Sequence, residues 1–174
     1  MDELPAGLDT ERHVLLHGRG RHPWYRRILF ALVLVVPLLA LLNVFGQNAS
    51  TSSANAPEAE VKVQSPERVR GGLMYQVRID VIAHQTLRQP QLVLSPGWWE
   101  EMTENSVNPD PVQASSSNGR VTLSYSQLNA GQKLRVWLQY QVNPITVGKR
   151  TTNVFLTDGG NGLVEVHRSM TVFP

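Results

Sequence analysis

The sequence predicts an all-β protein of two packed sheets, about seven strands in all, preceded by a single transmembrane α-helix. Two observations predict this class. A nearly unbroken apolar run lies near the N-terminus, and apolar and polar residues alternate with period two through most of the chain after residue 60. The chain contains no cysteine, so its folding cannot depend on disulfides, and a cysteine-free external domain is typical of bacterial cell surfaces.

The predicted transmembrane helix covers residues 28–46. The run from Ile28 to Phe45 holds no charge, and its roughly 18 residues reach about 27 Å, close to the hydrocarbon thickness of a bilayer. Pro37 is expected to kink such a helix rather than break it. The competing interpretation is a cleaved signal peptide, whose apolar region is usually about 7 to 15 residues long. The longer run and the long basic leader favour an uncleaved anchor.

Charge on either side of the run predicts the topology. Residues 1–27 form a basic segment, and the first cation after the run is Lys62. Because basic residues stay on the cytoplasmic side, the N-terminus is expected inside and the C-terminal domain outside the cell membrane, in a single pass. The residues expected to determine this topology are Arg19, Arg21, Arg26 and Arg27.

Two regions follow the anchor. Residues 47–59 are rich in Ser, Ala and Asn with one proline, a composition that cannot build a core, so they are predicted to be a flexible linker. Residues 60–174 are predicted to be the extracytoplasmic β-sandwich. A domain of about 115 residues buries roughly two thirds of its surface and folds alone.

Alternation and turn signals define the strands of this domain. The clearest alternation places Tyr75, Val77, Ile79 and Val81 on one face, and no convincing helix interrupts the series. An immunoglobulin-like two-sheet sandwich buries such a set of short strands. The expected strands lie within 61–64, 73–82, 92–94, 121–125, 133–142, 151–157 and 163–173.

Five short segments carry a family resemblance. They are VRGGLMY at 69–75, LSPG at 94–97, LNAGQ at 128–132, QVNP at 141–144 and TTNV at 151–154. This series resembles the bacterial immunoglobulin-like conserved-repeat surface modules over about residues 61–173. The resemblance implies the fold and a role as a spacer, stalk or adhesive module. The matching residues are turn and core positions, so they indicate a fold rather than an activity.

Three tryptophans are candidates for partner contact. Trp98 and Trp99 begin the longest non-periodic stretch of the domain, a loop expected from Gly97 to Gly119, and long loops are often functional. Trp137 falls on the polar face of its strand, where either a neighbouring side chain or another protein must cover it. Trp98 and Trp99 could contact a partner or stack on a sugar. Alternatively, they could close one end of the sandwich.

No catalytic, metal or cofactor site is recognisable, and the chain is not predicted to be an enzyme. His84 and His167 lack ligand partners at suitable spacing, and the glycine-rich segment 158–162 lacks the alternating oxygen ligands of a calcium loop. Glu100, Glu101 and Glu104 are expected to be solvated. His13, His17 and His22 are also expected to be solvated. The net charge is only +2, and the basic residues of the domain do not cluster into a stripe along its sequence. Both observations argue against nucleic-acid binding.

These features predict a membrane-anchored, extracytoplasmic interaction module, an accessory or structural subunit of a membrane or envelope assembly with a protein partner. The alternative is a module that binds envelope polysaccharide through exposed tryptophans, since aromatic side chains are common at binding hot spots.

Overall fold

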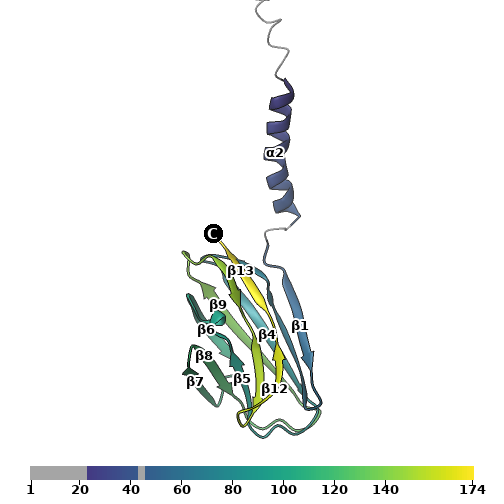
Figure 1. Cartoon of the computed structure of the whole chain (residues 1–174), viewed down its shortest axis with the longest axis vertical. Helices are drawn as coiled ribbons and strands as arrows, with labels where there is room; N and C mark the ends of the chain where they lie inside the picture. Colours follow the sequence, from purple (N-terminus) through teal and green to yellow (C-terminus); the bar gives the residue numbers. More distant parts are fainter. Residues whose placement is uncertain (1–22, 43–45) are drawn as a thin grey trace, which may run out of the picture. The chain divides into compact units, whose positions relative to one another are not determined.

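The structure is a computed structural model that describes residues 23–42 and 46–174 (Figure 1). The chain divides into two compact units, Met1–Phe45 and Gly46–Pro174. Arg19 and Arg21, two of the arginines expected to set the topology, lie outside the described residues, as does Phe45.

The first unit contains the helix α2 (Pro23–Leu41), and every residue from Trp24 to Val36 on it is exposed. Its 18-residue stretch Trp24–Leu41 has a mean hydropathy of 1.9, long and apolar enough to cross a membrane, and a signal sequence meets the same criteria. The helix begins before the predicted start at residue 28, so Arg26 and Arg27 lie within it. The prediction started the helix where the apolar run starts. A helix is defined by its backbone hydrogen bonds, which form between polar residues as well, so it can begin before the apolar run.

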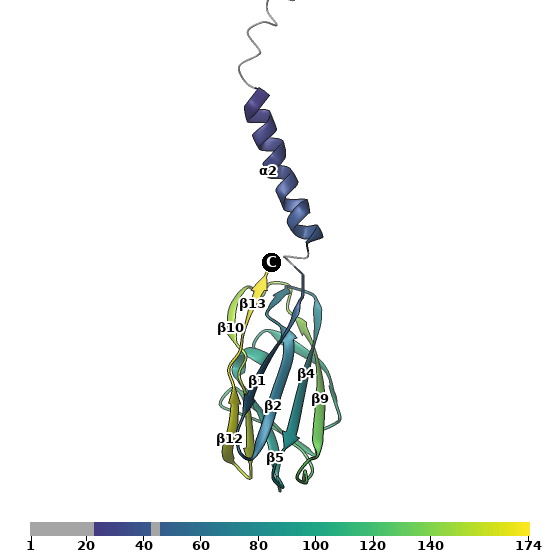
Figure 2. The same ribbon diagram turned by 90° about the vertical axis from the view of Figure 1, so that its right-hand side faces the viewer.

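The second unit is an all-β sandwich, which confirms the predicted fold class (Figures 1 and 2). We name its two five-stranded sheets I and II. In order across the sheet, sheet I contains β1 (Ala49–Asn55), β2 (Ala59–Pro66), β4 (Met74–Ala83), β9 (Lys133–Val142) and β6 (Met102–Asn108). Sheet II contains β12 (Asn161–Val166), β11 (Val154–Asp158), β5 (Pro90–Leu94), β8 (Arg120–Ser124) and β7 (Gln113–Ser117).

A third, three-stranded sheet adjoins them, with the order β10 (Gly148–Thr151), β13 (Ser169–Phe173) and β3 (Arg68–Arg70). All strand pairs are antiparallel except β13 with β3, which is parallel. One cluster of buried apolar side chains fills the space between sheets I and II. It includes Val61, Ile79 and Leu138 from sheet I and Leu92, Leu123 and Leu156 from sheet II.

The predicted flexible linker is wrong for most of its length. Residues 49–55 form β1, which pairs with β2 in continuous register from Ala49 opposite Pro66 to Asn55 opposite Glu60. The small polar side chains of this segment show no hydrophobic alternation, so no strand was predicted there. A strand can nevertheless form through backbone hydrogen bonds to a neighbouring strand alone. The folded domain therefore begins earlier than the predicted residue 60.

The predicted loop from Gly97 to Gly119 is also wrong, because it contains a short 3₁₀ turn η2 (Pro96–Trp98) and both β6 and β7. In addition, the two expected strands 151–157 and 163–173 are each divided. Of the first, only Thr151 belongs to β10 and residues 154–157 belong to β11. Of the second, residues 163–166 belong to β12 and residues 169–173 to β13. In each case the two strands lie in different sheets. The described chain thus has thirteen strand segments instead of about seven.

Candidate functional site

Trp98 is a core residue, and its burial contradicts the predicted role in partner contact. Its exposed fraction is 0%, and its ring stacks on that of Tyr140 with centroids 6.0 Å apart. Its Nε1 donates to the carbonyl oxygen of Asn153 at 3.2 Å. A Cβ on Gly97 would lie 2.2 Å from the carbonyl oxygen of Thr151, so the turn before Trp98 can approach β10 because residue 97 is glycine.

Trp99 is half-buried at one long side of the sandwich. Its ring meets Tyr140 edge-on, with centroids 5.6 Å apart, and its buried Nε1 has no hydrogen-bond partner among the described residues. It lines a groove of about 390 Å³ between the edge strands β6 and β7, together with Glu104 and Ser115. Burial raises the pKa of Glu104 above its usual value. Of the adjacent pair, Trp99 is therefore the one with access to a ligand.

Trp137 lies on the outer face of sheet I, as its position on the polar side of β9 predicted. Its direct cross-strand neighbours are Arg78 on β4 and Asn108 on β6. The guanidinium of Arg78 lies 5.6 Å from the centroid of the indole, within the range of a cation–π contact. This contact covers part of the ring, which is why Trp137 is half-buried without any partner protein.

Beside Trp137, a buried carboxylate gathers three cations. Asp80 is 3% exposed, and its oxygens lie 2.7 Å from Arg135 Nε, 3.3 Å from Arg78 Nε and 3.5 Å from Lys133 Nζ. Burial of Asp80 opposes its ionisation, but the hydrogen bond from Arg135 and the charges of all three bases outweigh this effect and lower its pKa. Asp80 is thus ionised at neutral pH and holds the side chains of Arg78, Lys133 and Arg135 on the outer face of sheet I.

The result is a face with an ordered indole and an excess of positive charge. We call it the tryptophan face and define it by Arg78, Asp80, Lys133, Arg135 and Trp137. Lys62, opposite Asp80 on β2, adds a further cation that pairs with Glu60 at 2.9 Å. Trp, Tyr and Arg are the residue types enriched at interface hot spots.

Two glutamates expected to be solvated have an ion-pair partner. Glu100 and Glu101 pair with Arg150. Within residues 23–42 and 46–174, no group of three or more His, Asp or Glu side chains is arranged to hold a metal ion.

Segment 158–162 joins β11 to β12 in a tight connection. The Asp158 carboxylate accepts the backbone N–H groups of Arg88 at 3.2 Å and Gln89 at 2.6 Å, and it therefore fixes a neighbouring loop.

Arg168 was not identified from the sequence, although it is the most extensively hydrogen-bonded side chain of the described domain. It lies between β12 and β13 and is 7% exposed. One terminal nitrogen donates to Ser52 Oγ at 2.8 Å and to the carbonyl of Val63 at 3.0 Å. The other donates to Ser50 Oγ at 2.8 Å and to the carbonyl of Ser65 at 2.9 Å.

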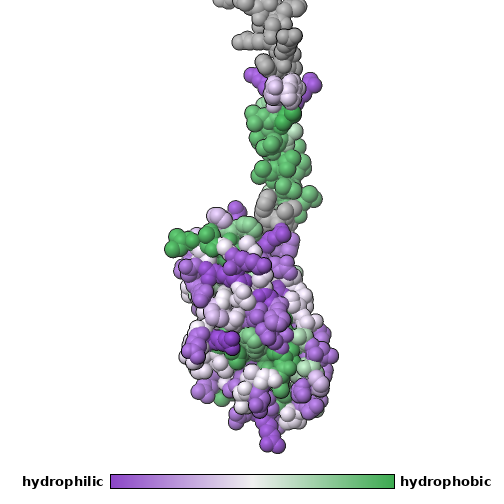
Figure 3. Space-filling model, in the orientation of Figure 1, coloured by the Kyte–Doolittle hydropathy of each residue, from purple (hydrophilic) through white to green (hydrophobic). Residues whose placement is uncertain are grey.

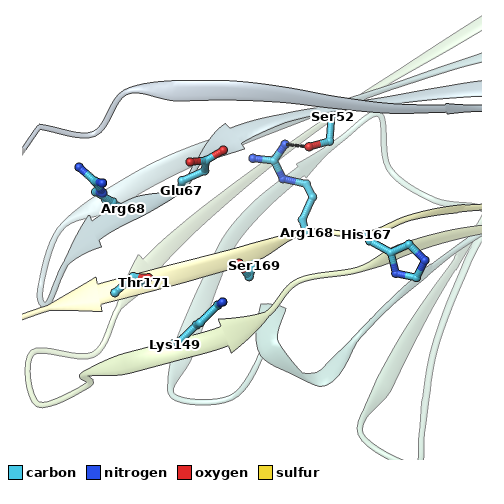
Figure 4. A pocket seen from close by; sticks show the side chains of 8 residues that line it. All are labelled: Ser52, Glu67, Arg68, Lys149, His167, Arg168, Ser169 and Thr171. Carbon is cyan, nitrogen blue, oxygen red and sulfur yellow. Dashed lines mark hydrogen bonds between the residues drawn. The ribbon is translucent and has the colours of Figure 1, made fainter.

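A polar pocket of about 450 Å³ lies beside Arg168, lined also by Glu67, Lys149 and His167 (Figure 4). Arg168 points toward Ser52 in this view. Both terminal nitrogens are already occupied by strand oxygens, so the guanidinium serves to join β1 and β2 to the β12–β13 junction. A sequence signal for this role exists, since Arg168 continues the inward series Val164, Val166, Met170 with period two.

Comparison with known proteins gives distant similarities of structure. No protein-family model matches the chain, and no curated protein matches its sequence. The solution structure of CaCohA2 from Clostridium acetobutylicum has 13% identity and a TM-score of 0.43, covering 68% of this chain and 92% of that one. A non-cellulosomal cohesin from the hyperthermophilic archaeon Archaeoglobus fulgidus has 10% identity and a TM-score of 0.40, covering 73% and 92%.

The sporulation control protein Spo0M from Bacillus subtilis has 16% identity and a TM-score of 0.40, covering 70% of this chain and 51% of that one. At these TM-scores and identities, nothing about the function of the chain follows from the similarities. The function has to be inferred from its own residues.

Proposed function

We propose that the chain is a single-pass membrane protein, anchored by α2 with its N-terminus in the cytoplasm, and that its sandwich is a non-enzymatic interaction module outside the membrane. The length and hydropathy of Trp24–Leu41 support the anchor. The arginines before the apolar run support the orientation. The all-β fold is compatible with the finer resemblance to bacterial immunoglobulin-like conserved-repeat modules, which we retain as part of this proposal.

The tryptophan face is the proposed contact surface. The single observation on which this rests is the half-buried indole of Trp137, in cation–π contact with Arg78 on a sheet face that also carries Arg135 and Lys133. Asp80 fixes these cations, so less side-chain entropy is lost when a partner binds. We propose an acidic surface of another membrane or envelope protein as the partner, and the chain as its accessory or structural subunit.

A photocrosslinking amino acid at Gln139, next to Trp137 on β9 and half-buried, tests this contact in intact membranes with the full chain. We expect one protein product that Trp137→Ala reduces about tenfold, a loss typical of a modest hot spot near 1.4 kcal/mol. Phe155→Ala is the matched control, because Phe155 on sheet II makes a similar contact with Arg120, at 5.1 Å. A product that Trp137→Ala leaves unchanged would contradict the proposed surface.

The alternative function, binding of envelope polysaccharide, is now restricted to two of the three tryptophans. Trp98 is fully buried, whereas Trp99 lines the β6–β7 groove with a carboxylate and serine side chains, a combination suited to sugar hydroxyls. Binding of purified envelope polysaccharide to the full chain, abolished by Trp99→Ala and retained by Trp137→Ala, would favour this alternative over protein contact.

A further inference from the structure

One end of the sandwich presents large apolar side chains to solvent. Ile145 is 87% exposed, and Leu73, Val147 and Phe173 are each more than 40% exposed. They come from three separate segments: the β3–β4 turn, the β9–β10 connection and the end of β13. Figure 3 shows an apolar area at one end of the domain. We call these four residues the apolar end.

Backbone hydrogen bonds hold the three segments together. Gly71 N donates to the carbonyl of Phe173 at 2.8 Å, and Gly72 N donates to the carbonyl of Val142 at 2.9 Å. Val142 N in turn donates to the carbonyl of Leu73 at 3.1 Å. A Cβ on Gly71 would lie 2.7 Å from the carbonyl oxygen of Pro144, so the turn and the connection are in close contact. The apolar end is therefore a fixed surface assembled from distant parts of the chain.

Basic side chains flank this surface. Arg70 is directly opposite Phe173 in the β3–β13 pair, and Lys149 is opposite Thr171. Both are exposed, as is Arg68 two residues before Arg70. Among the nearby acids, Glu101 is already paired with Arg150, which leaves Glu67 as an exposed acid beside Arg68. The combination of exposed apolar tips and adjacent cations matches the chemistry of a bilayer surface with anionic headgroups.

The first strand starts at this same end of the sandwich. Ala49 pairs with Pro66, two residues before β3, which leads to the Gly71–Gly72 turn. Residues 42–48 join α2 to β1, and a chain of this length spans under about 30 Å even when fully extended. An anchored chain therefore holds Ala49, and with it this end, within a short distance of the membrane.

We propose that the apolar end rests on the bilayer, with Leu73, Ile145, Val147 and Phe173 in the interfacial region and Arg70 and Lys149 against anionic headgroups. This inference rests on the proposed membrane anchoring. It adds that the domain has a defined orientation on the membrane, which a tether alone does not give. In that orientation the strands of sheet I rise from the surface and present the tryptophan face sideways.

The absence of cysteine allows a direct test with the full chain. Ile145→Cys and, as the control at the opposite end of the strands, Asn161→Cys at the start of β12 are each labelled with an environment-sensitive fluorophore. The two proteins are reconstituted into vesicles of phosphatidylcholine with phosphatidylglycerol. We expect a blue-shifted emission and severalfold stronger quenching by nitroxide-labelled lipid at position 145 than at position 161. Val147→Cys provides a second position if labelling at 145 disturbs folding.

Charge reversal sharpens the test. Arg70→Glu with Lys149→Glu is expected to reduce the quenching at position 145 severalfold in vesicles that contain phosphatidylglycerol. Equal quenching at positions 145 and 161 would overturn the inference. Protection of position 145 from an aqueous quencher without quenching by labelled lipid would also overturn it, since a protein would then cover this end. Flotation with the vesicles after alkaline washing tests the anchor separately, so a chain that floats but shows no difference between the labels refutes only the orientation.

Discussion

The two long sides of the sandwich are closed in different ways. On the side where β12 lies against β1 and β2, the buried guanidinium of Arg168 donates four hydrogen bonds to oxygens of β1 and β2. On the side between β6 and β7 a groove remains, and aromatic rings of Trp98, Trp99 and Tyr140 pack behind it. There the buried Nε1 of Trp99 and the hydroxyls of Tyr125 and Tyr140 have no hydrogen-bond partner in the described structure, whereas on the first side only the Nε of Arg168, among the atoms of its guanidinium, has none.

The difference shows that the side closed by Arg168 depends on specific hydrogen bonds. A buried cation is strongly destabilising without compensating partners, so Arg168 requires the oxygens of Ser50, Ser52, Val63 and Ser65. Burial lowers the pKa of Arg168, while the charge of Glu67 opposes this shift, and arginine stays protonated in either case. Packing of aromatic rings on the β6–β7 side needs no such exact set, and this side can therefore remain accessible to a ligand.

The strongest test of this contrast is Arg168→Met. It leaves four oxygens without their charged donor, and we expect the free energy of unfolding to fall by about 3 kcal/mol. Urea denaturation of the full chain in detergent, followed by tryptophan fluorescence, measures the change. The control is Arg88→Met at an exposed position, expected to change stability by less than about 0.5 kcal/mol. Equal effects of the two substitutions would show that the hydrogen bonds of Arg168 contribute nothing.

Hydrogen exchange compares the two sides without a substitution. We expect backbone amides of β1 that bond to β2 to exchange roughly tenfold or more slowly than amides of β7 that bond to β8, because all five residues of β7 are exposed. In Arg168→Met, the protection of β1 is expected to fall toward that of β7. Protection of β7 equal to that of β1 in the unmodified chain would remove the proposed difference.

A smaller effect is expected for one of the hydroxyl partners. Ser52→Ala removes one oxygen from Arg168 and is expected to lower the free energy of unfolding by about 1 kcal/mol. Ser115→Ala on β7, where the serine is exposed beside the groove, is the matched control and is expected to be nearly neutral. Thermal unfolding of both variants gives the comparison. A neutral Ser52→Ala would mean that the remaining oxygens satisfy Arg168.

The smallest effect is expected on the β6–β7 side. Tyr140→Phe removes a buried hydroxyl that has no partner, so stability is expected to stay within about 0.5 kcal/mol of the original or to rise slightly. The same urea titration measures it. A loss of more than about 1 kcal/mol would indicate that the hydroxyl does bond, and Glu104, directly across the β6–β9 pair, is the first acceptor to examine.

The sequence predicted those parts of the fold that hydrophobic alternation specifies. The alternating residues of β4 and β9 appear as two central strands of sheet I, with Val77 opposite Leu138 in the core. It could not predict β1, because a Ser- and Ala-rich strand at a sheet edge is stabilised by backbone pairing and by a distant arginine. Nor could it predict the division of the last two long strands, since the break at Asn153 and Arg168 depends on contacts between them.

The candidate site shows the same limit. All three tryptophans were identified from the sequence, but their environments differ because of residues far along the chain. Asn153 receives the Trp98 indole N–H, 55 residues away, and Arg78 covers Trp137 from the neighbouring strand. The period-two series identified Trp137 as outward-facing. The same period-two alternation places Arg168 on the inward face. The prediction counted only apolar residues as inward-facing and therefore left Arg168 out.

The pairing of β1 has a mechanical consequence. In the proposed anchored chain, tension on the N-terminal side reaches the domain through β1. Because β1 lies beside β2 over seven paired positions, the component of this tension along β1 loads the ladder in shear, so many hydrogen bonds must fail together. Arg168 adds bonds across the direction of pull at Ser50 and Ser52. In the proposed anchored chain, the strand predicted to be a flexible tether is thus the element that transmits force to the sheet that presents Trp137.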